Sequence, residues 1–309
     1  MPRCQITPEV GHRWDWTIDG RRVTQWCSAP SDPRPCFYPL IGPSSVSLTR
    51  MGHPGAPDHD HHRSVWFAHN LVMGVNFWAD GTGARVVQRR WLAIEDGDEW
   101  GGMAVELEWL DGHNPAPLLH QTLVAIMYPD EQRQWQLEIQ SDFEARNGAI
   151  ELAASNFGIF AVRLAKSLSV AFGGGRLRCS EGREGEPRIF EQTARWVDYS
   201  GPVEVWEASQ PRQVTEGVTY FDHPSNPSYP SRWHVRSDGW MTASTSQPNG
   251  IVIDAEHPLR VRYLLDVHEG ELDSERANGI ASEFAARPAW LVRRSERPHR
   301  HFDLLPTDA

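Results

Sequence analysis

Runs in which apolar and polar residues alternate recur along most of the chain. The clearest is residues 104–110, AVELEWL, in which the side chains at 105, 107 and 109 are apolar and two glutamates separate them. A period of two is typical of a β-strand with one buried face and one solvated face. Similar runs occupy residues 85–94, 102–110, 118–127, 134–140, 152–162, 194–199, 218–221, 240–243, 251–254 and 261–267. The pattern predicts a protein built mainly from antiparallel sheet.

Turn signals separate these runs and support the same fold class. Asp19-Gly20 stands between two strand-like runs, and Asn249-Gly250 stands before another, as is typical of tight β-hairpin turns. Residues 271–286 are the exception, because their apolar positions have helical spacing and Pro288 follows them. We therefore predict an all-β protein, a large antiparallel β-sandwich with one notable helix near the C-terminus. No linker marks a boundary, so residues 1–309 are expected to form a single domain.

Composition narrows the function classes. The 309 residues are 39% hydrophobic and 23% charged, which is ordinary for a globular protein, and the formal net charge of −11 argues against a nucleic-acid partner. No apolar stretch is long enough to cross a bilayer, and the N-terminus lacks the apolar core of a signal peptide, so we expect a cytoplasmic protein with no membrane partner. Four cysteines, which have no metal-finger spacing, are expected to be free thiols: Cys4, Cys27, Cys36 and Cys179.

Histidines concentrate in one short segment. Five of the fourteen fall between His53 and His69, together with aspartates, an arginine and an asparagine. Glycine and proline open the segment and an apolar run closes it, which indicates a loop leading into a strand. Imidazole titrates near neutral pH and is a common metal ligand, so this segment predicts proton transfer or metal binding.

His59 and His61 are candidates for both roles. Alternation on an extended segment puts their side chains on one face, as two ligands of a divalent metal would require. Two nitrogen ligands rarely hold zinc alone, and no third ligand is evident in the sequence. Equally, the imidazoles could hydrogen-bond the backbone of a polar turn.

The rest of the segment offers substrate contacts. His62 and Arg63 could bind an oxyanion of a substrate, because arginine presents two fixed donors, or they could pair with Asp58 and Asp60. His69 and Asn70 could line a pocket or cap a turn.

A second polar segment, residues 222–236, supplies a carboxylate, two histidines, an amide and two arginines within fifteen residues. His234 and Arg236 alternate on a presumed strand and should face the same way. Asp222 and His223 are further candidates for the site, whereas Asn226 and the neighbouring prolines are typical of a tight turn. We predict that this segment and residues 58–70 meet at one concave site.

Fourteen tryptophans are more than a typical core needs, and flat indole faces suit the apolar faces of sugar rings. Most are expected in the core. Trp66, Trp78 and Trp233 are expected near a ligand, because each lies inside or beside a polar segment.

Four sequence words together resemble the PmoA-like family, some of whose members carry the label "methane oxygenase PmoA". The words are DHDHHRSVWFAHN at 58–70, GVNFW at 74–78, WVDYSGP at 196–202 and FDHPSNPSYPSRWHVR at 221–236. The resemblance covers roughly residues 30 to 290. It implies a β-supersandwich similar to galactose-mutarotase-like proteins, and an association with sugar oxidoreductases and sugar-isomerase-like proteins. Residues 154–158 depart from the family, which commonly has a more charged Phe-Gly-Asp-containing word there; Asn156 in this segment is included among the candidate substrate contacts.

We interpret the chain as a carbohydrate-active enzyme that acts on a sugar or glycoside, including keto-glycosides. A histidine, His59, His61 or His234, would remove a proton next to a carbonyl and lead to elimination, C–O bond cleavage or epimerisation. A non-catalytic carbohydrate-binding protein, a glycoside hydrolase using Asp60 and Asp222, and a metal-dependent oxygenase are the alternatives. The cofactor is unspecified, with a divalent metal as the open alternative, and the sequence does not specify an oligomeric state.

Overall fold

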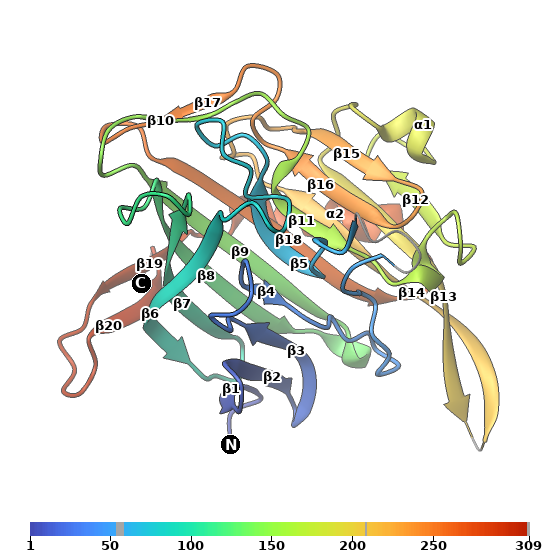
Figure 1. The fold of residues 1–309 in the computed structure, drawn as a ribbon. Helices are drawn as coiled ribbons and strands as arrows, with labels where there is room; N and C mark the ends of the chain where they lie inside the picture. The colour runs from blue at the N-terminus through green and yellow to red at the C-terminus, as the bar shows by residue number, and fades with distance from the viewer. Residues whose placement is uncertain (54–58, 208, 308–309) are drawn as a thin grey trace.

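The alternating segments form two large antiparallel sheets that pack face to face (Figure 1). The structure is a computed structural model, and it describes residues 1–53, 59–207 and 209–307. The prediction of an all-β sandwich is confirmed, because strands dominate the described residues and α2 is the one substantial helix among them.

The first sheet has eight strands and carries the candidate site on its outer face. In spatial order these strands are β1 (Cys4–Glu9), β2 (Arg13–Ile18), β3 (Arg21–Cys27), β4 (Cys36–Phe37), β5 (Val65–His69), β11 (Gly158–Arg163), β16 (Trp240–Ser244) and β15 (Arg232–Arg236). Strands far apart in sequence meet at its centre, where β5 and β16 both pair with β11.

The second sheet also has eight strands and includes the alternating runs predicted between residues 85 and 140. In spatial order these strands are β12 (Arg176–Cys179), β13 (Trp196–Glu207), β14 (Gln210–Asp222), β18 (Leu259–Glu269), β9 (Trp135–Glu144), β8 (Leu119–Pro129), β7 (Gly101–Leu110) and β6 (Arg85–Glu95). The β13–β14 ribbon continues past both of its neighbours and projects from the body of the molecule (Figure 1).

The hydrophobic core fills the space between the two sheets. Phe160 of the first sheet stacks on Tyr263 of the second, with ring centroids 5.3 Å apart and an interplanar angle of 10°. Tyr220 meets both rings and donates its hydroxyl to the Phe160 carbonyl at 3.1 Å, so this buried phenol keeps a hydrogen-bond partner. Inward-facing side chains of both sheets therefore share one core.

Other elements cover the outer face of the second sheet. Helix α2 (Ser274–Ala286) begins at the N-cap Asp273, whose side chain accepts from two backbone N–H groups, and it ends before Pro288, as predicted. Its buried residues pack on Trp196, Phe221 and Leu264. A hairpin of β19 (Trp290–Arg294) and β20 (Phe302–Pro306) packs beside β6 and β7.

One strand prediction is wrong. Residues 152–162 were expected to form a single strand, but β10 (Ile150–Leu152) pairs with β17 (Ile251–Ile253), and the next strand begins only at Gly158. The intervening residues turn instead: Ser155 Oγ accepts from the Phe157 N–H and donates to Asn70. Local side-chain hydrogen bonds of this kind compete with sheet pairing. The break positions Phe157 over the outer face of the first sheet.

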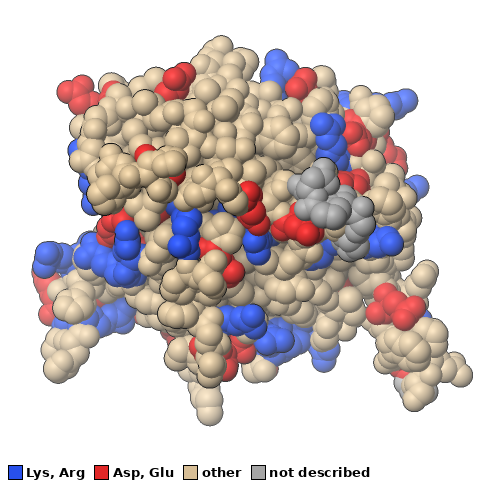
Figure 2. Space-filling model, in the orientation of Figure 1, with Lys and Arg blue, Asp and Glu red and all other residues tan. Residues whose placement is uncertain are grey.

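Three short helices complete the described structure: η2 (Glu131–Arg133), η3 (Lys166–Leu168) and α1 (Glu186–Ile189). No helix among the described residues has the length and apolar character needed to cross a bilayer. On the face seen in Figure 2, basic and acidic side chains are interspersed, and they leave a largely uncharged area in the upper part of the view.

Because Phe160 is fully buried and contacts aromatic rings of both sheets, its truncation should destabilise the sandwich. We expect Phe160→Ala to lower the free energy of unfolding by about 3–5 kcal/mol, measured by urea denaturation. Leu291→Ala is the control, because Leu291 is 47% exposed on the β19–β20 hairpin and should stay within about 0.5 kcal/mol of the unaltered protein. Equal losses in the two variants would contradict this description of the core.

Candidate functional site

Strand alternation gives the central strands of the first sheet two different faces. In β15, Trp233 and Val235 belong to the core between the sheets, whereas His234 and Arg236 line a pocket on the outer face. The strand pairings align the residues that face outward in one row across the sheet. This row consists of Cys36, Trp66, Ala161, Thr242 and His234. This outward-facing row is therefore built on paired strands, which hold side chains more firmly than a loop does.

A pocket of about 160 Å³ opens above this face. It is lined by His59, His62, Phe157, Arg163, His234, Arg236, Asp238 and Trp240. The two polar segments recognised in the sequence thus meet here, represented by two histidines of the first and by His234 and Arg236 of the second. The volume lies below the roughly 300–1,000 Å³ of pockets for drug-sized ligands, so it suits one small ring.

A buried ion pair forms part of the pocket wall. Arg163 is fully buried at the end of β11, and its Nη1 and Nη2 donate to Asp238 Oδ1 and Oδ2 at 2.9 and 3.1 Å. Arg50 donates to the Asp238 carbonyl, and His53 Nε2 lies 3.4 Å from Asp238 Oδ2. Burial alone would raise the pKa of Asp238, but the Arg163 guanidinium holds it below its usual value. Asp238 is therefore an ionised carboxylate bound by arginine.

His234 is held in one orientation by the backbone of residue 156. Its Nδ1 lies 3.1 Å from the Asn156 carbonyl, which can only accept, so Nδ1 carries the proton and Nε2 keeps its lone pair. Nε2 is buried and has no hydrogen-bond partner among the described residues. Burial and then the Arg236 charge lower the pKa of His234 to about 3. The imidazole is consequently neutral at neutral pH, with a free acceptor atom beside the pocket.

His62 lies in an aromatic cage. Its ring centroid is 5.7 Å from that of Trp66, 6.1 Å from Trp78 and 5.9 Å from Trp240. Burial, followed by the charge of Arg163, lowers the pKa of His62 to about 2. Trp66 and Trp78, which were expected near a ligand, thus form a floor against which the pocket residue His62 packs.

His59 and His61 lie beside this cage. The two rings are almost parallel with centroids 6.0 Å apart, and His61 also contacts His62 and the edge of Trp78. Among described residues, one group of three or more potential metal ligands comes within 4.8 Å, and it is Glu106, Glu108 and His120. That group is on the other sheet. The described residues therefore add no third ligand to His59 and His61.

Arg236 is the more accessible cation of the pocket. Its Nη1 donates to Glu186 Oε1 of α1 at 2.9 Å, and its guanidinium lies 4.4 Å from the Phe190 ring centroid. Its side chain is 42% exposed, in contrast to Arg163. It can thus turn toward an anionic group in the pocket while remaining anchored on an aromatic face.

Several predicted substrate contacts are engaged elsewhere. Arg63 donates to Asp80 Oδ2 at 2.9 Å instead of entering the pocket. His69 lies against Ser246 Oγ at 2.9 Å, and burial lowers its pKa to about 4. Asn70 accepts a hydrogen bond from Ser155, and Asn156 contributes its backbone carbonyl to His234. Asp58 lies outside the described residues.

The structure does not bring Asp222 and His223 into the pocket. Asp222 accepts from Asn226 Nδ2 at 2.7 Å and from the Ser231 N–H at 2.8 Å, which closes the turn before β15. Burial raises the pKa of Asp222 to about 6. His223 packs its ring against Phe284 of α2, away from His234. This carboxylate and histidine maintain the fold.

Trp233 requires a correction. It was expected near a ligand, but it is fully buried between the sheets, where Nε1 donates to the Ala194 carbonyl at 2.8 Å. The reason is strand alternation, since a residue next to His234 must face the opposite way.

Four pocket residues were not identified from the sequence: Phe157, Arg163, Asp238 and Trp240. One signal was available for Arg163, which ends the otherwise apolar run GIFAVR. A charged side chain in a buried strand normally has a specific partner.

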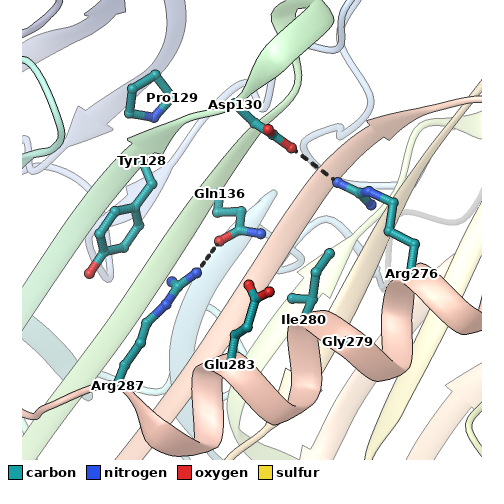
Figure 3. A pocket seen from close by; sticks show the side chains of 9 residues that line it. All are labelled: Tyr128, Pro129, Asp130, Gln136, Arg276, Gly279, Ile280, Glu283 and Arg287. Atoms are coloured by element: carbon teal, nitrogen blue, oxygen red, sulfur yellow. Dashed lines mark hydrogen bonds and ion pairs between the residues drawn. The ribbon is translucent and has the colours of Figure 1, made fainter.

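A second pocket of about 460 Å³ lies between α2 and strands β8 and β9 (Figure 3). Its two arginines are already held by neighbouring groups. Arg276 bonds Asp130 and Asp266, and Arg287 donates to Gln136 Oε1 at 2.6 Å. Because these contacts link α2 to the second sheet, we assign them to the packing of the helix.

Comparison with known proteins gives a family. The model of a family of unknown function, DUF6807, matches residues 13–282. The chain belongs to this family. No curated protein matches the sequence significantly. Among solved structures, a putative kojibiose phosphorylase from human microbiome is 8% identical with a TM-score of 0.35; the match covers 92% of this chain and 36% of that protein. The match thus spans about a third of the length of that protein.

In this DUF6807 member, His62 should make stability depend on pH. Between pH 7 and pH 5 the folded state binds almost no proton at His62, because burial lowers its pKa to about 2, whereas the unfolded chain is protonated there below its ordinary pKa of 6.5. Stability is therefore lost as pH falls through 6.5. His62→Phe should reduce the loss of unfolding free energy between pH 7 and pH 5 by about 2 kcal/mol, measured by urea denaturation. Trp66→Phe alters the same cage without removing a titrating group and should leave the pH-dependent loss unchanged.

Proposed function

We propose that this protein is an enzyme that acts on a sugar or glycoside by removing a proton next to a carbonyl group. The substrate class with such an acidic proton is an oxidised sugar, such as a keto-glycoside. One observation carries the proposal: His234 is a neutral imidazole whose Nδ1–H is fixed by the Asn156 carbonyl and whose buried Nε2 has no partner among the described residues beside the pocket. A positioned imidazole of this kind is a typical proton acceptor.

The neighbouring groups supply the rest of the chemistry. When Nε2 takes the proton, negative charge grows on the carbonyl oxygen, and Arg236 can donate to that oxygen. The same negative charge favours protonated His234, which offsets the low pKa of the free imidazole. The enolate then expels an oxygen substituent, which is elimination, or takes a proton on its other face, which is epimerisation. His59 lines the same pocket and belongs to the first polar segment, residues 58–70. It is our candidate for the group that transfers the second proton.

Glycoside hydrolysis fits the pocket less well. It normally needs two carboxyl groups about 5–9.5 Å apart, and Asp238, the one carboxylate among the described lining residues, is bound by Arg163. Asp222, part of the pair considered from the sequence, closes a turn elsewhere. A metal-dependent oxygenase would need a third ligand beside His59 and His61, which the described residues do not add. A non-catalytic sugar-binding protein could use the same pocket, and turnover separates the two functions.

The proposal predicts a specific role for His234. Incubation with ring-oxidised methyl glucosides in deuterated water should introduce solvent deuterium next to the carbonyl, detected by NMR. His234→Ala should lower kcat by roughly 10²–10⁴-fold with an unchanged circular dichroism spectrum. His223→Ala is the matched control, because it removes a buried histidine of the same segment outside the pocket. Binding without turnover would support the sugar-binding alternative, and unchanged turnover in His234→Ala would assign the chemistry to other residues.

A further inference from the structure

A short apolar segment stands beside the pocket and plays no part in the chemistry described above. Residues 169–173 follow η3, and the Ala171 N–H donates to the Ser237 carbonyl at 2.8 Å. Ser237 lies between Arg236 and Asp238, two lining residues of the pocket. The segment is therefore fastened to the pocket wall.

The segment exposes an aromatic side chain. Phe172 is 53% exposed and Val170 is 40% exposed. The Phe172 ring centroid lies 5.9 Å from that of His53, and His53 Nε2 lies 3.4 Å from Asp238 Oδ2 inside the pocket. Contacts thus run from Phe172 through one histidine to the lining carboxylate. The exposed ring is therefore apolar surface that a ligand extending from the pocket could cover.

A cation accompanies the ring. Lys166 Nζ lies 5.6 Å from the Phe172 centroid, and Lys166 is the single lysine of the sequence. An aromatic face with a flexible ammonium donor beside it suits a pyranose, whose apolar C–H face packs on the ring while its hydroxyl groups accept hydrogen bonds. A phenyl ring could occupy the same position by stacking.

We propose that Phe172 and Lys166 form an outer subsite that binds the second ring of a glycoside whose first ring occupies the His234 pocket. The inference rests on the proposed function and narrows its substrate class. The pocket of about 160 Å³ suits one ring. The second ring of a two-ring substrate would therefore extend to residues 169–173 and cover Phe172. The enzyme would therefore prefer a glycoside with a ring-shaped aglycone to a free sugar or a methyl glycoside.

Two ring-oxidised probes, a phenyl glucoside and a methyl glucoside, test this preference. Phe172→Ala should raise KM for the phenyl glucoside about three- to tenfold, with kcat and the methyl glucoside unaffected, and Phe172→Trp should restore the lower KM. Trp206→Ala is the control, because Trp206 is 68% exposed near the end of the β13–β14 ribbon, which projects from the body of the molecule (Figure 1). Equal effects on both probes, or none on either, would overturn the subsite.

The same probes separate failure of the subsite from failure of the proposed function. Their binding to the full chain and to His234→Ala can be measured by saturation-transfer NMR, which requires no turnover. Tighter binding of the phenyl glucoside that depends on Phe172, in a protein that turns over neither probe, supports the subsite and rejects the catalytic proposal. Binding that is equally strong for both probes rejects the subsite whether or not turnover occurs.

A different observation concerns two cysteines at the edge of the same outer face. Cys27 of β3 and Cys36 of β4 are register partners in an antiparallel pair, which places their side chains on one face at a Cα separation compatible with a disulfide. Cys36 is buried and Cys27 is half-buried against the aromatic cluster of Trp66 and Trp78. Cys27 Sγ donates to the Tyr38 carbonyl at 3.9 Å, and the neighbouring Cys36 thiol lowers the pKa of Cys27.

Residues 28–35, between the two cysteines, contact the segment in which the histidines concentrate. Arg34, fully enclosed, donates to the His61 carbonyl at 2.9 Å and to Asp80 Oδ1 at 2.8 Å. We infer that Cys27 and Cys36 form a reversible disulfide that ties this segment. The Cys27 thiolate attacks a disulfide such as oxidised glutathione and releases one thiol; Cys36 then loses its proton and displaces the second thiol. Two protein thiols are oxidised and one external disulfide is reduced.

Treatment of the full chain with oxidised glutathione should remove two hydrogen atoms from the intact mass, and peptide mapping should find the bond between Cys27 and Cys36. Reduction should reverse it, and hydrogen exchange of residues 28–35 should slow in the oxidised form. Cys36→Ser should instead keep a glutathione adduct on Cys27, whereas Cys179→Ser should still form the bond. An unchanged mass in the unaltered protein, or a bond involving Cys4 or Cys179, would overturn the inference.

Discussion

The ion pair between Arg163 and Asp238 is the contact on which the geometry of the pocket depends. It joins the end of β11 to the turn between β15 and β16, so it helps to fix the position of His234 and Arg236 relative to the central strand β11. Burying a guanidinium is costly unless its charge is matched, and the bidentate carboxylate matches it. Removing Asp238 would leave an uncompensated charge on the fully buried Arg163, so the pair has a structural role before any role toward a substrate is considered.

The same arrangement explains why buried histidines can exist here at all. An imidazole accepts burial more readily when it is neutral, and the charges of Arg163 and Arg236 favour the neutral form of His62 and His234. Stability below neutral pH is reduced as a consequence, since the unfolded chain gains protons that the folded chain does not bind. The buried histidines of the pocket, His62 and His234, thus also lower the stability of the folded state in acid.

The sequence predicted the sandwich well because each strand needs only its own period of two. The same rule placed His234 and Arg236 on one face. Because neighbouring residues of a strand face opposite sides, it also implies that Trp233 faces away from the site. The pairing of Arg163 with Asp238, 75 positions apart, depends on β11 meeting β16, and no local pattern encodes that neighbour. Asp222 and His223 were misleading for the opposite reason, because polar side chains that close a turn or face a helix look like catalytic residues when read without their partners.

The outer faces of the two sheets differ in what covers them. Helix α2 and the β19–β20 hairpin pack on the second sheet, whereas the first sheet is covered in part by loops that leave the pocket open. On that floor the indole N–H groups of Trp66, Trp78 and Trp240 are buried and have no acceptor among the described residues. Buried donors in native proteins usually meet a protein group, an ordered water or a ligand. The Trp240 donor and the His234 acceptor belong to residues that line one pocket, which supports our proposal of a ligand rich in oxygen atoms over an apolar one.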